Sequence, residues 1–298
     1  MKNEVPMARR WCAVPILLSL GLLTGCDVEQ WGDSHRYQAD FHESHPMKSG
    51  DRLYLENLNG SVEISGWDQQ TADISGTKYA STEAILEALK IDVVASGDSI
   101  RIRTVRPSGH MGNMGARYVI RVPRGARLEQ IQSSNGSLRI RDIDASARLE
   151  TSNGTIEVAS VDGPVTMHTS NGAIRADGVQ RGIEGTTSNG SIRVVLGKVE
   201  ERRPVRLTSS NGSVELAVDD LGGSEVVVRT SNASITARLP QSVAADVKAS
   251  TSNGRLTNEF ESSFQGRSER NFMEGTIGGG GPLLSLTTSN GSIRLLKR

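Results

Sequence analysis

Two clusters in this sequence contain side chains that could bind a metal ion or act as acids and bases. His42 and His45 flank Glu43 in the stretch FHESH. Their spacing differs from the His-Glu-x-x-His pattern of zinc enzymes, and no third ligand is apparent. The other cluster is Asp219 and Asp220 in AVDDLGGS. A glycosidase needs two carboxyl groups about 5 to 9.5 Å apart across a groove, whereas adjacent acids at a corner are more often solvent-facing turn formers.

The other residues that could carry chemistry are isolated. His110 and His168 stand alone, and the glycine run at 278–281 lacks the Lys-Ser or Lys-Thr that follows in a phosphate loop. The serines of a repeated Ser-Asn-Gly motif have no repeated histidine or lysine to act as a base. We therefore predict no catalytic residue, no metal-binding residue and no cofactor.

The Ser-Asn-Gly motif is the main organising feature of the chain. Successive asparagines are separated by 76, 18, 18, 18, 22, 21, 21 and 37 residues. A nearly constant period of about twenty residues is typical of a solenoid, in which each repeat stacks on the next. The asparagines of the motif are Asn59, Asn135, Asn153, Asn171, Asn189, Asn211, Asn232, Asn253 and Asn290.

Apolar residues alternate on both sides of each motif. Around Asn153, for example, Leu149 and Thr151 precede it and Ile156 and Val158 follow it, which indicates two strands with one buried face each. The inward parity shifts at Asn-Gly, so the chain must turn a corner there. We expect the glycine to supply a positive φ. We expect the asparagine to point inward and to bond to backbone groups and to the asparagine of the next coil.

Second corners such as VDGP and ADGV follow about ten residues after the first ones. Two short strands and two corners per period predict an all-β fold, a single-stranded parallel β-helix (β-solenoid) with about 18–22 residues per coil. The alternative is an antiparallel meander, because Asn-Gly is also a strong hairpin signal. In-register stacking would align Arg139, Glu157 and Arg175 into an outward ladder of alternating charge, which we interpret as a solvated face.

The first residues indicate export and lipid attachment. Lys2, Arg9 and Arg10 precede an apolar run, and LTGC ends at Cys26, which resembles the lipobox of bacterial lipoproteins. We predict a lipoprotein signal peptide over 1–25, Cys26 as the lipid-bearing mature N-terminus, and a polar tether over 26–50. The mature chain would have 31 Lys and Arg against 33 Asp and Glu, so nothing indicates nucleic acid as a partner.

Two segments break the repeat. Residues 51–134 are predicted to form an N-terminal β-rich part with a short helix over 81–90, where STEAILEALK has helical spacing. Residues 135–298 are predicted to form the solenoid. An insertion near 258–281 carries Phe260, Phe264 and Phe272, and we interpret it as a loop that caps the last coils, with a contact site for a partner as the alternative.

The stretches LYLENLNGSVEISGWD and YVIRVPRGARLEQIQSSNGSLRI, with the later Ser-Asn-Gly coils, resemble a bacterial β-strand-repeat family of unknown function that is provisionally labelled as adhesins. The resemblance covers about residues 50–298. It implies a parallel β-helix exported to the cell envelope and brings no catalytic residue.

We therefore expect a non-enzymatic, lipid-anchored envelope protein that faces the periplasm from a bacterial membrane and acts as a binding or adhesin-like scaffold. Its partners would be the membrane, through Cys26, and an envelope protein or glycan. The alternative is a carbohydrate-active β-helix enzyme, a lyase or hydrolase of the periplasm, because parallel β-helices host such enzymes. An enzyme would show a groove with clustered acids, or with Lys or Arg beside acids, whereas a scaffold would show uniform ladders.

Overall fold

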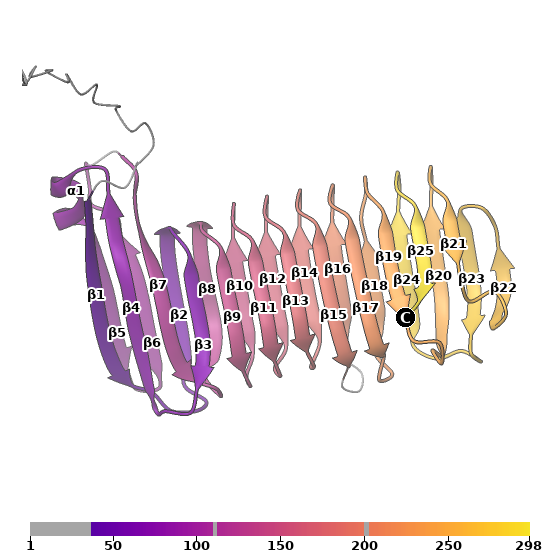
Figure 1. Cartoon of the computed structure of the whole chain (residues 1–298), viewed down its shortest axis with the longest axis horizontal. Helices are drawn as coiled ribbons and strands as arrows, with labels where there is room; N and C mark the ends of the chain where they lie inside the picture. The colour runs from indigo at the N-terminus through magenta and orange to yellow at the C-terminus, as the bar shows by residue number, and fades with distance from the viewer. Residues whose placement is uncertain (1–36, 110–111, 200–202) are drawn as a thin grey trace, which may run out of the picture. The chain divides into compact units, whose positions relative to one another are not determined.

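The computed structural model describes residues 37–109, 112–199 and 203–298, which belong to one compact unit spanning Ser34–Arg298. Two long β-sheets run through this unit (Figure 1), and apolar side chains fill the space between them. No helix in the described part of the chain is long and apolar enough to cross a membrane. The predicted signal peptide and Cys26 lie outside the described residues.

Sheet A is parallel from β7 onward and carries two antiparallel strands, β4 and β1, at its N-terminal end. Its strands, in spatial order, are β1 (Tyr37–Pro46), β4 (Thr71–Ala80), β7 (Met114–Pro123), β3 (Val62–Trp67), β9 (Leu138–Ile143), β11 (Ile156–Val161), β13 (Ile174–Val179), β15 (Ile192–Lys198), β17 (Val214–Asp220), β19 (Ile235–Leu239), β25 (Ile293–Lys297) and β21 (Leu256–Asn258).

Sheet B is parallel in its middle and has antiparallel strands at both ends. Its strands, in spatial order, are β22 (Phe264–Ser268), β23 (Phe272–Ile277), β20 (Ala245–Thr251), β24 (Leu283–Thr288), β18 (Val226–Arg229), β16 (Val205–Ser209), β14 (Ile183–Thr187), β12 (Val165–Thr169), β10 (Ala147–Thr151), β8 (Arg127–Asn135), β2 (Arg52–Asn59), β6 (Ser99–Val105) and β5 (Lys90–Ser96).

Each regular coil contains a strand of sheet B, a Ser-Asn-Gly corner, a strand of sheet A and a second corner. Neighbouring coils pair in parallel, with Ala147 opposite Val165 in sheet B and Ile156 opposite Ile174 in sheet A. Buried and exposed residues alternate along these strands, so the inner faces of both sheets share one core. The predicted all-β solenoid with two short strands per coil is confirmed, and the antiparallel meander is excluded.

The Ser-Asn-Gly corner differs from the prediction in the side chain that points inward. The asparagines are exposed, apart from the half-buried Asn59, whereas the Thr or Ser two positions earlier is buried. Thr187 Oγ1 donates to the carbonyl of Gly172 in the neighbouring coil at 3.0 Å and accepts from the Gly190 amide at 3.1 Å. A small hydroxyl therefore serves the buried backbone groups of the corner. The same bond to the neighbouring coil's glycine carbonyl is made by Thr151, Thr169, Ser209, Thr230 and Thr251.

The glycine of the corner is required by close packing of the backbone. Eight of the asparagines are followed by glycine, all in the described part of the chain, and among these glycines only Gly60 has a positive φ, at 112°. A Cβ on Gly172 would overlap the carbonyl oxygen of Gly154 in the neighbouring coil, and Gly190 has the same relation to Gly172. The predicted positive φ is therefore wrong for the regular coils, where the backbones approach too closely for a side chain.

The 75 residues between Asn59 and Asn135 do not interrupt the stack. β2 and β3 pair directly with β8 and β9, while β6 and β7 form a further coil on the other side of β2 and β3. The expected helix is α1 (Glu83–Ala88), whose N-cap Thr82 accepts from the Ile85 amide at 3.3 Å. The part expected over 51–134 and the solenoid expected from 135 thus form continuous sheets.

Residues 37–46, within the predicted tether, form β1 and pair antiparallel with β4. Tyr37, Ala39 and Phe41 alternate with more exposed residues, and the Phe41 ring packs edge-on against Tyr118 with centroids 5.4 Å apart. A strand forms here because a short apolar alternation can cover the edge of an existing sheet. The tether prediction is wrong for this stretch.

The last three coils stack in an order that differs from the sequence. β24 and β25 lie between the coil of β18 and β19 and the coil of β20 and β21 (Figure 1). The insertion near 258–281 is a strand hairpin, β22 and β23, rather than the predicted loop. It pairs antiparallel with β20 and buries Phe260 and Met273 completely. The hairpin covers the edge of sheet B that the last coil would otherwise expose.

Candidate functional site

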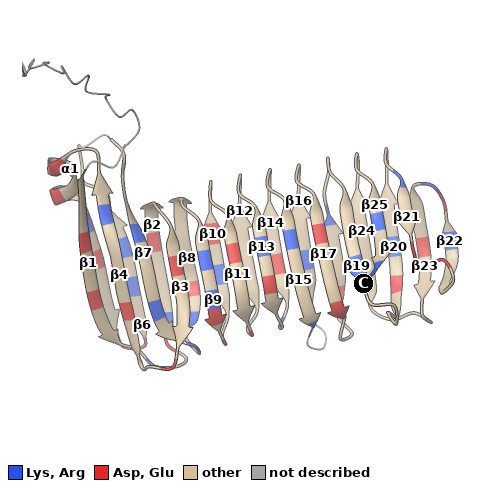
Figure 2. Cartoon of the chain, in the orientation of Figure 1, with Lys and Arg blue, Asp and Glu red and all other residues tan. Residues whose placement is uncertain are grey.

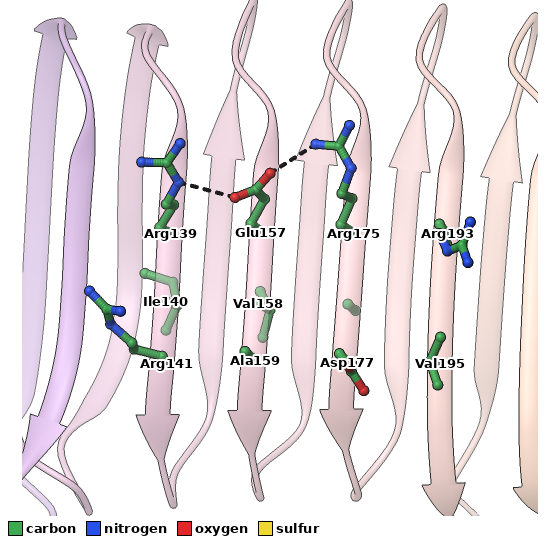
Figure 3. A pocket seen from close by; sticks show the side chains of 11 residues that line it. Arg139, Ile140, Arg141, Glu157, Val158, Ala159, Arg175, Asp177, Arg193 and Val195 are labelled. Carbon is green, nitrogen blue, oxygen red and sulfur yellow. Dashed lines mark hydrogen bonds and ion pairs between the residues drawn. The ribbon is translucent and has the colours of Figure 1, made fainter.

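A groove of about 460 Å³ lies on the outer face of sheet A and crosses β9, β11, β13 and β15 (Figure 3). Long charged side chains alternate with small apolar ones along it. Two outward rows of residues define it, the first with Arg139, Glu157, Arg175 and Arg193, and the second with Arg141, Ala159, Asp177 and Val195. A hollow of this size falls within the range of small-molecule and cofactor sites.

The parallel register builds both rows. Arg139 lies opposite Glu157, Glu157 opposite Arg175, and Arg175 opposite Arg193. Residues two apart on one strand point to the same side, so the second row runs beside the first. The groove is therefore a direct product of the repeat, because each coil places the same sequence position at the same height.

Ion pairs join the members of the first row. Glu157 accepts from Arg139 Nε at 3.0 Å and from Arg175 Nη1 at 2.8 Å, and Arg139 Nη1 donates to Glu63 at 2.8 Å. The hydrogen bonds to Glu157 and then to Glu63 raise the pKa of Arg139 above its ordinary value. Exposed pairs of this kind contribute about 0–1 kcal/mol each. Through these pairs Glu157 bridges the arginines of the two neighbouring coils.

Charges of both signs are spread over the strands rather than gathered in a single-sign field (Figure 2). The alternating ladder predicted for Arg139, Glu157 and Arg175 is present in the structure. Arg193 breaks the alternation, and its nearest carboxylate is Glu215 on the following coil, with Nη1 and Oε2 3.2 Å apart.

The nine asparagines form a column on the outside of the corner. Apart from Asn59, each donates through Nδ2 to the Oδ1 of the asparagine in the neighbouring coil, at 2.6–2.8 Å. All donate toward the N-terminal end, where Asn59 Nδ2 donates to the Met114 carbonyl at 2.7 Å. The structure therefore brings together all nine residues predicted as a ladder, and places them at the surface instead of in the core.

The two histidines predicted as weak metal candidates do not converge. Both lie on β1, where His42 Nε2 is 2.6 Å from Asp73 Oδ1 and His45 Nε2 is 3.0 Å from Glu43 Oε2. Within residues 37–109, 112–199 and 203–298, no three His, Cys, Asp or Glu side chains form a group that could hold a metal ion.

The paired acids at the second corner have separate contacts. Asp219 Oδ1 lies 2.9 Å from Arg298 Nη1, and Asp220 Oδ1 accepts from the Gly222 amide at 2.9 Å, which closes a turn. His168 lies opposite Glu150 and is exposed on the outer face of sheet B. His110 falls outside the described residues.

Asp73 is a buried carboxylate that the sequence patterns did not single out. It lies on β4 and contacts Arg121 of β7 and His42 of β1. Burial alone would raise the pKa of Asp73, but hydrogen bonds from Arg121 and His42 outweigh burial and hold that pKa below its ordinary value. The sequence signal for this site was an aspartate placed between two apolar residues, Ala72 and Ile74, which are both buried in the structure.

The second row of the groove was also missed by sequence reasoning. The charged row predicted from the sequence lies four residues after each asparagine. The second row lies six residues after each asparagine, at Arg141, Ala159, Asp177 and Val195, and these residues lie beside the charged row in Figure 3.

Solved structures similar to this chain come from several bacteria. A candidate cell adhesion protein from Clostridium sporogenes is 12% identical, with 87% of this chain and 100% of that chain covered and a TM-score of 0.30. A candidate adhesin from Bacteroides fragilis is 12% identical, with 87% and 97% covered and a TM-score of 0.28. A candidate lipid binding protein from Parabacteroides distasonis is 10% identical, with 86% and 96% covered and a TM-score of 0.34.

No curated protein matches the chain. The family model described as Toastrack DUF4097 matches residues 46–231, which is more than half of the sequence and includes most of the Ser-Asn-Gly coils. The two-sheet stack of parallel strands and the repeated corner are thus the features of a known family, and this chain belongs to the Toastrack DUF4097 family.

Proposed function

We propose that this protein is a non-enzymatic binding scaffold of a bacterial cell envelope, and that the outer face of sheet A binds an envelope glycan or protein. The observation that supports this most directly is the groove across β9, β11, β13 and β15. Its charged side chains recur at one position per coil and are linked by ion pairs. A surface that repeats along one axis suits an extended partner that also repeats.

A lipid on Cys26 would hold the scaffold at a membrane that faces the periplasm. The supporting observations are the charged start, the apolar run and the LTGC sequence that ends at Cys26. Metabolic labelling with a radioactive fatty acid tests the anchor. We expect label in the membrane fraction for the natural chain, and no label for Cys26→Ala. Equal labelling of both proteins would overturn the anchor.

Retention of envelope polymers and proteins on the full chain, purified in mild detergent, tests the binding role. We expect at least one envelope glycan or protein to be retained and no product to be released from any glycan. Release of oligosaccharides would overturn the non-enzymatic proposal in favour of a lyase or hydrolase. In that case Glu157→Gln and Asp177→Asn would show whether the acids of the groove carry the reaction.

A further inference from the structure

The row of charges along the groove alternates in sign except at one step. From β3 to β13 it reads Glu63, Arg139, Glu157, Arg175, and the next residue in register is Arg193 rather than an acid. Neighbouring strands lie about 4.8 Å apart, so two guanidinium groups stand on adjacent coils with no carboxylate between them. Like charges directly opposite each other in a sheet repel.

Each of these two arginines is paired on its far side. Arg175 Nη1 donates to Glu157 at 2.8 Å, and Arg193 Nη1 lies 3.2 Å from Glu215 Oε2. Their side chains are 57% and 68% exposed. A guanidinium has five N–H donors, so both arginines retain donors for a group placed between them. An anion there would continue the alternating pattern of the row.

The surface around Arg175 and Arg193 favours an extended polymer that carries anionic groups. On the second row, Val195 lies beside Arg193 and Asp177 beside Arg175, while Ala159 lies one coil further on beside Glu157. Ala159 and Val195 give small apolar contacts, and the hollow extends over four coils. The residues that line the groove carry four arginines and two acids. The lining therefore has two more arginines than acids, and Glu63 and Glu215 pair with Arg139 and Arg193 beyond its two ends.

We infer that the groove binds an acidic polysaccharide and that Arg175 and Arg193 together bind one of its anionic groups. This inference rests on the proposed binding role of sheet A. The coil spacing is close to the length of one sugar residue in an extended chain, so alternate rings of a polysaccharide laid along the row can lie over Ala159 and Val195, with Asp177 between them. The planar guanidinium group of arginine can donate two parallel hydrogen bonds to the oxygens of a carboxylate or phosphate.

An anionic membrane surface fits the same residues less well. The arginines flank a hollow, whereas a bilayer surface is flat, and Glu63 and Glu215 bracket the row on both sides. The face as a whole therefore lacks the uniform basic field that attracts a protein to anionic lipid. The same mixture of signs argues against a nucleic acid.

Binding measurements on the full chain with Cys26→Ser, which lacks the proposed lipid anchor and so binds vesicles only through its protein surface, test the inference. The probes are polygalacturonate, its methyl-esterified form, a glycerol phosphate polymer, neutral dextran, and vesicles of phosphatidylglycerol. We expect the natural chain to bind one or both anionic polymers, with affinity that falls as salt rises, and to bind the esterified polymer and dextran at least about tenfold more weakly.

Matched variants locate the site. Arg175→Gln and Arg193→Gln should each weaken binding of the anionic polymer about tenfold. Arg206→Gln is the control, because Arg206 is a similarly exposed arginine on sheet B that pairs with Glu225 at 3.4 Å, and it should leave binding unchanged. Glu157→Gln should tighten binding, since it frees donors of Arg139 and Arg175 without adding a contact.

The outcomes separate this inference from the proposed function. Equal binding of the esterified and acidic polymers would overturn the anion site and leave the scaffold role standing. Loss of binding with Arg206→Gln but not with Arg193→Gln would move the site to sheet B and also overturn it. Binding to phosphatidylglycerol vesicles alone would favour a membrane surface instead. Retention of no polymer or envelope protein would overturn both proposals.

Discussion

The buried hydroxyls of Thr169, Thr187, Ser209 and Thr251 each join backbone groups from two coils. Thr187 donates to Gly172 of one coil and accepts from Gly190 of its own. Buried backbone groups without partners are costly, and here one side chain pairs two of them. The exposed asparagines also link neighbouring coils, but water can replace their bonds. The threonines should therefore contribute more to stability than the asparagines do.

Replacement of Thr187 by valine tests this directly. Thr187→Val keeps the side-chain shape and leaves the Gly172 carbonyl and the Gly190 amide without that partner, so we expect a loss of about 1–3 kcal/mol. Thr186→Val is the matched control, because Thr186 is adjacent on β14 and faces outward. Urea unfolding gives both free energies of unfolding. Equal losses for the two variants would contradict the buried-hydroxyl argument.

The corner of a coil also limits which residue can follow the asparagine. Gly172→Ala would place a Cβ against the Gly154 carbonyl oxygen, which is backbone of a neighbouring coil and cannot rotate away. We expect a loss of about 3 kcal/mol, measured as a shift of the urea midpoint.

Gly197→Ala is the control for that substitution. Gly197 lies on β15 and has no positive φ, and a Cβ added to it would meet no atom within 4 Å beyond its own chain neighbours. Alanine there should be neutral or stabilise the fold by up to about 1 kcal/mol, because it restricts the unfolded chain. A large loss at Gly197, or none at Gly172, would show that close approach of neighbouring coils does not explain the motif.

At the scale of elements, Asp73 holds three strands together. It lies on β4 and binds Arg121 of β7 and His42 of β1. Because the folded-state pKa of Asp73 lies below its ordinary value, the interaction stabilises the fold above about pH 3.9, the unfolded-state pKa. That stability is lost as the pH falls through the folded-state pKa.

The variant Asp73→Asn should therefore be less stable than the natural chain at neutral pH, and the difference should disappear in acid. The measurement is the free energy of unfolding of both proteins as a function of pH. Asp40→Asn serves as the control, since Asp40 is an exposed acid on β1 that accepts from Thr77 at 2.7 Å. A difference for Asp73→Asn that does not change with pH would contradict the carboxylate's role.

The coil period and the core were predictable because they depend on local alternation. Leu149 and Ile156, for example, show their inward direction from neighbouring residues alone. Thr151 follows Leu149 inward as the alternation predicts, but Asn153 does not. The direction of the asparagine was not predictable in this way, because the corner resets the parity between the two. The role of the glycine depends on how closely another coil approaches, which no single repeat specifies.

The candidate site was predictable only in part, for a related reason. The charges of the first row were visible at one position per repeat, but the groove depends on the second row as well. Its small members, Ala159 and Val195, carry no chemical signal of their own. They matter because parallel pairing places them beside long charged side chains.

At the scale of the whole solenoid, the order of the last coils was hidden by the repeat itself. Asn232 and Asn253 are 21 residues apart, as are Asn211 and Asn232, so the sequence is equally consistent with direct stacking of β20 on β18. In the structure β24 separates them, with Ser285 opposite both Val227 and Lys248. Coils whose strands pair in the same register can occupy each other's place in the stack, because each coil contacts only the coils beside it.

Deletion of residues 282–298 should allow β20 and β21 to take the place of β24 and β25. The registers permit it, since Val226 and Val247 both lie opposite Leu284, and Val228 and Ala249 both lie opposite Leu286. We expect a shortened solenoid that remains folded and is less stable, because smaller side chains replace the deleted leucines. Circular dichroism would report the fold and its melting temperature.

Engineered cysteines at outward positions give the decisive measurement, in a chain whose Cys12 and Cys26 are serine. The pair Val227→Cys and Lys248→Cys spans two strand spacings in the full chain, about 9.6 Å, which exceeds the reach of a disulfide. After the deletion the two positions become neighbours, so the disulfide should form only in the shortened chain. Val227→Cys with Ser285→Cys, neighbours in the full chain, is the positive control. A shortened chain that stays reduced would show that the position of a coil is fixed by more than its register.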